Sequence, residues 1–385
     1  MNRRQFLTAS GSTAGLGVGA YGIYTSITSP STARSAEEPA DDTDESTLPT
    51  ATTRSGSILS GISPSSVSPT HFNTLRQWLG SQQAVCVFFV DMDQSPDEID
   101  GIIELFEHIW QQGFVPHMFW QPNFGASDGE AQRVTKAVTN GEYDDQLESW
   151  ASALAEWLRR PADEPDRRAY ISLGPEFNGD WVPWAIPTPE ATPESYAGMW
   201  ERTHEIVMSN QVGRDHLQWV LSANNVSSAK IDLSACYPGD DYVDWLGVTG
   251  YNWNRWGGWK TPAEIFDRMI DNLREISDRP LAVSEFGCSV DCEEGYCPDR
   301  KDQWIHEAYD YFEANDVRLA CWFDHTKETE WGVFDTEYGT ETVEHDGTSY
   351  TAYGEYREAL ARETILPTHP VDGRRLSDEE FRGEF

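Results

Sequence analysis

The chain has 385 residues with 65 acidic and 28 basic side chains, a formal net charge of −37. This balance excludes binding to nucleic-acid phosphates or to an anionic membrane surface, because both need a basic face. The acidic residues are spread along the chain rather than gathered in a tail. That distribution is typical of halophilic proteins, in which carboxylates keep the surface hydrated and salt screens their repulsion.

The first residues have the pattern of an export signal. Arg3 and Arg4 form a twin-arginine pair, and residues 7–27 are weakly apolar and rich in glycine and alanine. That stretch is too polar for a stable membrane span and contains no cysteine for a lipid anchor. We therefore expect a twin-arginine signal over residues 1–36 and a secreted, extracellular protein without a membrane anchor.

The rest of the chain divides by composition into three parts. Residues 37–56 are rich in Asp, Glu, Ser, Thr and Pro without apolar periodicity, which predicts a disordered acidic linker. Residues 57–365 have the alternating pattern of a single large domain. Residues 366–385 are charged and have no period, so we expect a surface extension or a disordered tail.

Short apolar runs alternate with amphipathic stretches through the predicted domain, as in βα units around a parallel sheet. The predicted strands cover residues 58–62, 84–90, 114–120, 169–173, 217–222, 245–249, 281–284 and 319–323. The predicted helices cover residues 70–79, 96–112, 143–160, 193–210, 262–277, 302–315 and 353–362.

Eight strands, each but the fifth followed by a helix, predict a (β/α)8 barrel. The connection over residues 223–244 is weakly patterned. A doubly wound open sheet is the alternative fold, although such a sheet rarely needs eight strands of this regularity. In a barrel the active site forms at the carboxyl ends of the strands, so the residues that end each strand matter most.

Two glutamates end predicted strands on opposite sides of the barrel. Glu176 follows strand four, and Glu285 follows strand seven. A retaining glycosidase needs such a pair, because one carboxyl protonates the leaving oxygen while the other attacks the anomeric carbon. We therefore assign Glu176 as general acid/base and Glu285 as nucleophile; ordinary surface carboxylates are the alternative reading.

The segments around these glutamates resemble glycoside hydrolase family 26. Residues 176–184 resemble its acid/base segment, residues 284–287 its nucleophile segment and residues 244–253 its strand-six segment, while Trp322-Phe323-Asp324 is similar to its strand-eight segment. The resemblance implies retaining hydrolysis of β-linked polysaccharides, chiefly β-mannans, with some members acting on β-glucans or β-1,3-xylans. One departure is Pro175, where the family usually has histidine.

Aromatic and polar residues near the strand ends are candidates for substrate contact. Flat apolar rings stack on the C–H faces of sugars, and a tyrosine can hydrogen-bond a catalytic carboxylate. Trp322 is expected, from the resemblance, to form the floor under the sugar next to the scissile bond. For Tyr251 and Trp253, simple packing is an open alternative, and Asn178 also suits a turn. The full set of predicted substrate-binding residues is Trp120, Asn178, Trp181, Tyr251, Trp253 and Trp322.

Three of the six cysteines, Cys288, Cys292 and Cys297, cluster after the predicted nucleophile. Their spacing is not that of a standard zinc site, and an oxidising exterior favours at least one disulfide there. Cys86 and Cys321 fit buried strand positions as free thiols. No phosphate-binding glycine loop or metal-binding helix motif occurs, so we expect no cofactor and no metal. We also expect a monomer.

The leading functional hypothesis is an endo-acting β-glycanase of the β-1,4-mannanase type that works by double displacement. One alternative is an endo-β-glucanase of a related retaining barrel family. Another, suggested by Pro175, is a non-catalytic carbohydrate-binding protein on a degenerate hydrolase barrel.

Overall fold

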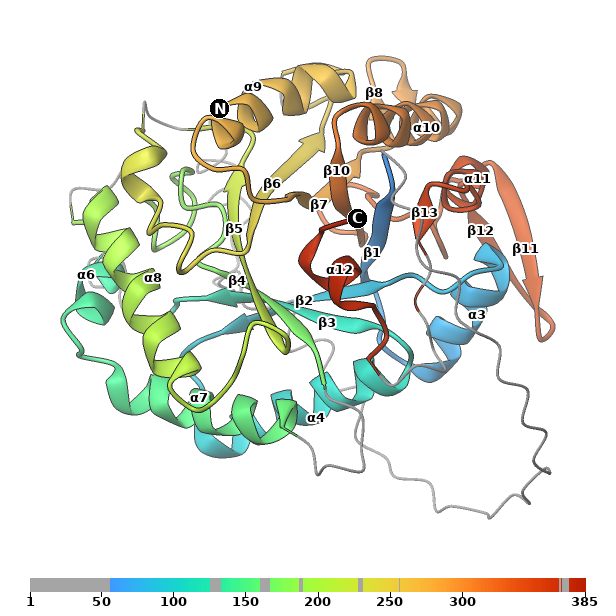
Figure 1. Cartoon of the computed structure of the whole chain (residues 1–385). Coiled ribbons are helices and arrows are strands. Elements are labelled where there is room, and N and C mark those ends of the chain that lie inside the picture. Colours follow the sequence, from blue (N-terminus) through green and yellow to red (C-terminus); the bar gives the residue numbers. More distant parts are fainter. Residues whose placement is uncertain are drawn as a thin grey trace, which may run out of the picture.

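The computed structural model describes residues 56–124, 133–159, 167–186, 190–227, 231–255, 257–366, 368 and 374–385. Eight parallel strands form a closed ring (Figure 1). They are β1 (Ile58–Pro64), β2 (Val85–Asp91), β3 (Val115–Gln121), β4 (Ala169–Leu173), β5 (Leu217–Asn224), β6 (Trp245–Asn252), β7 (Leu281–Cys288) and β10 (Val317–Asp324).

Pairing of the first and last barrel strands closes the ring. Residues of β1 pair in parallel with β10, from Leu59 beside Leu319 to Pro64 beside Asp324. An open sheet would leave these two strands as edges, so the predicted (β/α)8 barrel is confirmed and the doubly wound alternative is wrong. The predicted signal and nearly all of the predicted linker lie outside the described residues.

Helices surround the ring of strands. They are α3 (Pro69–Leu79), α4 (Pro96–Gln111), α6 (Val134–Thr139), α7 (Asp144–Leu158), α8 (Pro193–Met208), α9 (Pro262–Arg274), α10 (Pro298–Ala314) and α11 (Gly354–Leu360). Several begin at a capping Ser or Thr followed by proline, as at Ser68, Thr192 and Thr261. In the described part of the weakly patterned connection from β5 to β6, which leaves out residues 228–230, the regular structure is a short 3₁₀ turn, η1 (Ser234–Cys236).

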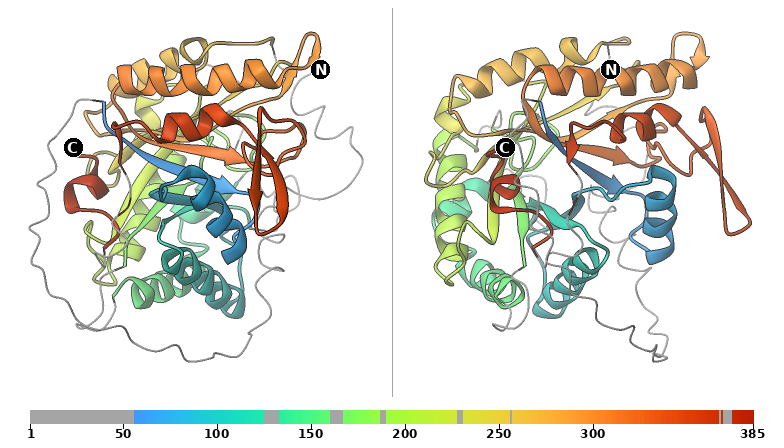
Figure 2. Two further views of the ribbon diagram at one scale, coloured as in Figure 1. Left: turned by 90° about the vertical axis from the view of Figure 1, so that its right-hand side faces the viewer. Right: turned by 45° about the vertical axis from the view of Figure 1, so that its right-hand side comes forward.

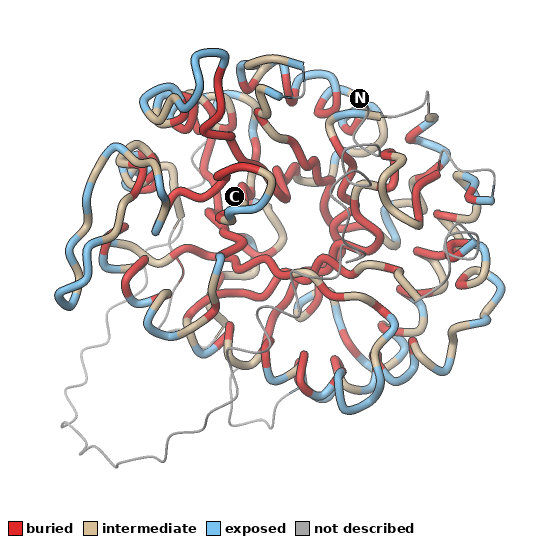
Figure 3. The backbone as a smooth tube through the Cα atoms, turned by 180° about the vertical axis from the view of Figure 1, so that it is seen from behind, coloured by how far each residue is buried: buried red, intermediate tan, exposed pale blue. Residues whose placement is uncertain are grey.

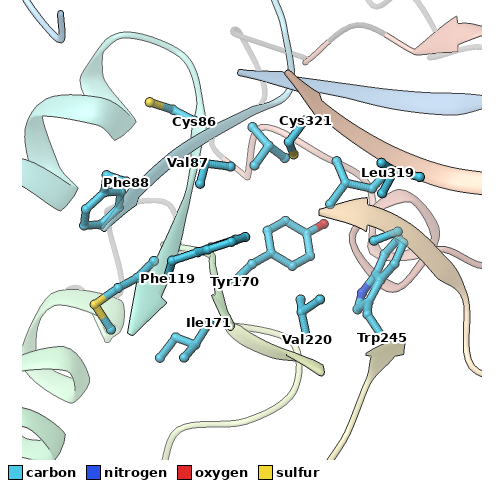
Figure 4. Close-up of a cluster of buried hydrophobic side chains, with 14 of the residues drawn as sticks. Cys86, Val87, Phe88, Phe119, Tyr170, Ile171, Val220, Trp245, Leu319 and Cys321 are labelled. Atoms are coloured by element: carbon cyan, nitrogen blue, oxygen red, sulfur yellow. The ribbon is translucent and has the colours of Figure 1, made fainter. Parts of the chain in front are cut away.

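The eight barrel strands are largely buried on both faces, and the exposed residues lie on the outer helices, hairpins and loops (Figure 3). Inside the barrel, Tyr170, Phe119 and Trp245 converge with smaller apolar side chains (Figure 4). His117 is fully buried beside them, and its Nε2 lies 2.9 Å from Ser172 Oγ. Burial lowers the pKa of His117 to about 3, so this histidine is a neutral structural residue.

The C-terminal segment covers the N-terminal end of the barrel, at the centre of the ring in Figure 1. Its helix α12 (Asp378–Arg382) places Phe381 against Tyr170, with ring centroids 4.9 Å apart. The Tyr170 hydroxyl donates to the Phe381 carbonyl over 3.0 Å. The buried Arg168 donates to the Leu376 carbonyl over 2.7 Å. Residues 374–385 are thus an ordered plug, which corrects the expected surface or disordered tail; a segment this short has too few turns to show a period.

Several short strands are present in addition to the eight barrel strands. Hairpin strands β8 (Asp291–Cys292) and β9 (Gly295–Tyr296) follow β7, and β11 (Glu341–His345) and β12 (Thr348–Ala352) form a hairpin that stands out from the barrel (Figure 2). The short strand β13 (Ile365–Leu366) pairs with β1. Within the described ranges, no helix has the length and apolar character needed to cross a membrane.

Candidate active site

Glu176 sits in a tight turn after β4. Its φ of +59° and the φ of +52° at Gly174 are both in the left-handed region. The turn is attached to β5, because the Glu176 amide donates to the Ser222 carbonyl on that strand over 2.8 Å. A left-handed conformation costs a non-glycine residue about 1 kcal/mol, and such strain is concentrated at functional sites. The turn therefore fixes where the Glu176 side chain points.

Three donors hold the Glu176 carboxylate. Its Oε1 accepts from Asn224 Nδ2 and from the Thr249 hydroxyl, each over 2.7 Å. Its Oε2 accepts from the indole N–H of Trp181 over 2.6 Å. These donors come from β5, β6 and the turn itself, so the half-buried carboxylate has a defined orientation over the mouth of the barrel.

Asn178 acts through the backbone rather than at the mouth. It is fully buried, and its amide exchanges two hydrogen bonds of 2.7 Å with the backbone of Asn224. This pair fixes the end of β5, from which Asn224 reaches Glu176. The prediction that Asn178 touches substrate is therefore corrected to a positioning role.

Glu285 lies on β7 with 7% of its surface exposed. Its Oε1 accepts a hydrogen bond from the Tyr251 hydroxyl on β6. The pairing of β6 with β7 shifts register here, since Val248 pairs with Val283 but the next residue, Thr249, pairs with Glu285. Such a bulge re-aims a side chain and is common next to active sites.

Strand register places the two glutamates at one level. Asn224 on β5 pairs with Thr249 on β6, and Thr249 pairs with Glu285 on β7. The first two of these side chains also contact the Glu176 carboxylate. The layer at the carboxyl ends of β5, β6 and β7 thus contains Glu285 and contacts the carboxylate of Glu176. Asn224 and Thr249 were not predicted as site residues, although Asn224 ends β5 and Thr249 ends the sixth predicted strand.

Aromatic rings surround the Glu285 side of the mouth. Tyr251 lies 5.0 Å from the Trp331 ring and 5.9 Å from Phe323, and Trp253 lies 5.6 Å from Trp331. Tyr251 and Trp253, predicted from the sequence, belong to this group. Phe323 and Trp331 lie in the stretch that resembles the family's strand-eight segment, but neither was predicted to contact substrate.

Two predicted contacts point away from the mouth. Trp322 is fully buried behind β10, 4.8 Å from Phe286 and 5.6 Å from Tyr356 of α11. Trp120 is fully buried behind β3, 5.4 Å from Trp150 of α7. Successive side chains of a strand point to opposite faces of the sheet, and both predicted tryptophans lie on the face that is turned towards the helices. The structure corrects both to core residues.

Three buried charged residues tie down the loop after β10 that carries Trp331. Lys301 of α10 donates from Nζ to the carbonyls of residues 330, 331 and 332 at 3.1, 3.0 and 2.6 Å. Asp324 accepts from the amides of residues 333 and 334. Glu330 accepts from the Tyr353 hydroxyl over 2.9 Å. Burial lowers the pKa of Lys301 to about 8 and raises that of Asp324 to about 6.

Cys292 and Cys297 form a disulfide that closes the β8–β9 hairpin, as the cysteine cluster suggested. Glu294 lies beside the two sulfurs, but sulfurs bonded to each other offer no thiolate to a metal ion. Cys86, Cys288 and Cys321 are buried free thiols.

A closed (β/α)8 barrel with a glutamate after strand four and another on strand seven defines the class of barrel glycoside hydrolases. The family model of glycosyl hydrolase family 26 matches residues 82–276, about half of the chain. The chain therefore belongs to this family.

Named relatives differ in the activity that their names give. The chain is 34% identical over 218 residues to endoglucanase H of Acetivibrio thermocellus, covering 53% of this chain and 22% of that protein. It is 26% identical over 133 residues to the β-1,3-xylanase TXYA of a Vibrio species, covering 33% of this chain and 25% of that protein. The match thus spans a quarter or less of these curated relatives.

The fold also matches solved structures. The catalytic domain of a family 26 endo-β-1,4-mannanase from Bacillus sp. JAMB-750 superimposes with a TM-score of 0.60 at 15% identity. The superposition covers 84% of this chain and 91% of that one.

Proposed function

We propose that this protein hydrolyses a β-linked polysaccharide by double displacement, with Glu285 as nucleophile and Glu176 as general acid/base. The observation that carries the proposal is the shared layer of Asn224, Thr249 and Glu285, two of whose side chains hold Glu176. Family membership supports the same chemistry.

In the first step Glu285 attacks the anomeric carbon as Glu176 gives its proton to the departing glycosidic oxygen. The Tyr251 hydroxyl, bonded to Glu285 Oε1, holds the nucleophile in its rotamer. In the second step Glu176 takes a proton from water, whose oxygen attacks the glycosyl-enzyme and releases Glu285. The product keeps the anomeric configuration of the substrate.

We propose β-1,4-mannan as the first substrate to test, with endo cleavage, from the resemblance of the motifs. A β-glucan is the second candidate, and the 34% identity to a protein named endoglucanase favours it. In both cases Trp181, Tyr251, Trp253, Phe323 and Trp331 are the rings from which we expect contact with the reacting sugars.

A non-catalytic binding protein is the competing proposal. It rests on Pro175, which stands where the family usually has histidine and whose backbone carbonyl accepts from the Trp184 indole over 2.7 Å. Trp181, Asn224 and Thr249 nevertheless hold the Glu176 carboxylate. A degenerate site would have no need of these contacts, so we favour catalysis.

We also propose that the protein acts outside the cell, in concentrated salt, and as a monomer. The twin-arginine pair at Arg3 and Arg4 supports export, and the net charge of −37 supports salt adaptation.

Reducing-sugar release from β-mannan, β-glucan and xylan, in molar salt, tests the function. We expect wild type to act on one of them, Glu176→Gln and Glu285→Gln to lose nearly all activity, and Glu104→Gln to keep it, since Glu104 is exposed on α4. Folded protein that binds a polymer but releases no sugar would favour the binding proposal instead.

A further inference from the structure

Two tyrosines, one exposed and one partly exposed, form a stacked pair on the mouth side of the barrel. Tyr296 of β9 and Tyr338 of the loop after β10 have ring centroids 4.4 Å apart and planes 23° from parallel. Tyr296 is 56% exposed. In the part of the chain that the structure describes, the only other exposed large hydrophobic residue is Val226. An aromatic face left in water on so acidic a surface calls for an explanation.

The backbone under each ring is rigidly held. The Cys292–Cys297 disulfide closes the hairpin around Tyr296, and the Cys297 amide donates to the Val290 carbonyl over 2.9 Å. The Tyr338 amide donates over 3.0 Å to a carboxylate oxygen of Glu330, itself a buried residue. Because the rings are already ordered, a ligand that stacks on them loses little further conformational entropy.

The pair belongs to the same rim as the proposed active site. The hairpin of Tyr296 follows β7, the strand of Glu285, and leads directly into α10. Tyr338 lies on the loop that carries Trp331. The two loops are joined where Ser289 Oγ lies 2.9 Å from Thr329 Oγ1, and where the Val290 amide donates to Glu330.

The charge around the pair selects the kind of ligand. Glu293, Glu294 and Glu337 are exposed within three residues of the two tyrosines in the sequence, and Arg300, 3.7 Å from Glu294, offsets one of the three negative charges. These carboxylates repel uronic acids and sulfated sugars, whereas a neutral pyranose offers apolar C–H faces to a ring and hydroxyls to a carboxylate.

We propose that Tyr296 and Tyr338 form a remote sugar subsite, which stacks on a neutral polysaccharide beyond the sugars that react between Glu176 and Glu285. The inference rests on the proposed function for the position of the chain. The subsite adds affinity for long substrates and leaves the chemical step untouched.

Affinity electrophoresis tests binding separately from hydrolysis. Tyr296→Ala and Tyr338→Ala are each made in a Glu285→Gln background and run through gels containing galactomannan, barley β-glucan or β-1,3-xylan. We expect roughly a three- to tenfold weaker affinity for the polymer that retards Glu285→Gln itself. The control is Tyr242→Ala, whose ring lies just before β6 at the opposite end of the barrel.

Kinetics in the catalytically intact protein complete the test. We expect Tyr296→Ala to raise KM on the polymer severalfold, with unchanged kcat and unchanged kcat/KM on a disaccharide substrate. The subsite would be overturned if Tyr296→Ala left both values unchanged: the retardation of Glu285→Gln by the polymer and the KM of the catalytically intact protein. Hydrolysis of the polymer by the wild type would then still support the proposed function. Tyrosine-dependent retardation without any hydrolysis would support the subsite and contradict the function.

Discussion

Thr249 is the strand-register partner of Glu285, and its hydroxyl donates to Glu176 over 2.7 Å. One β6 residue therefore lies beside one glutamate in the sheet and bonds the other with its side chain. This links the relative position of the two proposed catalytic carboxylates to the pairing of β6 with β7, because a change of register between these strands would move Glu285 relative to Thr249 and Glu176.

Thr249→Val removes this link while keeping the shape of the side chain. A hydrogen bond to a charged group contributes about 1.5–3 kcal/mol, so we expect kcat to fall by roughly ten- to a hundredfold. Initial rates at saturating concentrations of the preferred polymer measure kcat. Thr348→Val, in the outer hairpin, should leave kcat unchanged. A Thr249→Val enzyme with wild-type kcat would show that this hydroxyl does not position Glu176.

Asp324 links protein stability to pH. Its pKa is raised by burial from 3.8 to about 6, so the folded state favours the protonated form. The stability that this gives is present in full below pH 3.8 and is lost as pH rises through about 6. Asparagine keeps an acceptor for the amides of Val333 and Phe334 but does not titrate. We therefore expect the Tm of Asp324→Asn, relative to wild type, to increase between pH 4 and pH 7. A constant difference in Tm would contradict the shifted pKa.

Lys301 should control the position of Trp331. Lys301→Met removes all three donors to the loop carbonyls, so we expect a lower Tm and a higher KM on polymer. Lys301→Arg restores a cation and should recover part of both. If Lys301→Met lowered only Tm, with KM unchanged, the lysine would be structural without positioning the proposed sugar-contacting ring.

The C-terminal plug should stabilise the barrel without serving the chemistry. Phe381 is fully buried, and Phe→Ala changes in cores cost roughly 3–5 kcal/mol. We expect Phe381→Ala to lower Tm by several degrees, Phe381→Leu to lower it less, and kcat well below Tm to stay at the wild-type value. A wild-type Tm for Phe381→Ala would mean that the tail does not dock on Tyr170.

Salt should stabilise this protein strongly. At a net charge of −37, repulsion between carboxylates opposes folding, and the screening length falls from about 10 Å at 0.1 M salt to about 3 Å at 1 M. We expect Tm to rise continuously from 0.1 to 3 M KCl. A Tm that is flat or falls over this range would contradict the proposed salt adaptation.

Site residues that stand in short motifs at the ends of predicted strands could be predicted from the sequence. Site residues whose position depends on how the strands pair could not. Glu176, Glu285 and Tyr251 follow from short segments at strand ends. The choice of Phe323 over Trp322 depends on which face of β10 turns inward, which barrel closure fixes. The bulge beside Glu285 leaves no local signal either.

Longer-range relations were also beyond the sequence. Asn224 and Thr249 reach Glu176 across 48 and 73 residues of chain, so only the ring of strands brings them together. The docking of residues 374–385 under the barrel rests on Arg168 and Tyr170, at the start of β4. Nothing in the composition of that tail indicates this partner.

The most direct test of the central claim is mass spectrometry of the enzyme after reaction with a 2-deoxy-2-fluoro oligosaccharide that carries a good leaving group, built on the sugar of the preferred polymer. Double displacement predicts a covalent fluoroglycosyl adduct on the peptide that contains Glu285, and no adduct in Glu285→Gln. Hydrolysis of the natural polymer with an inverted anomeric product, and no adduct on Glu285, would contradict the account.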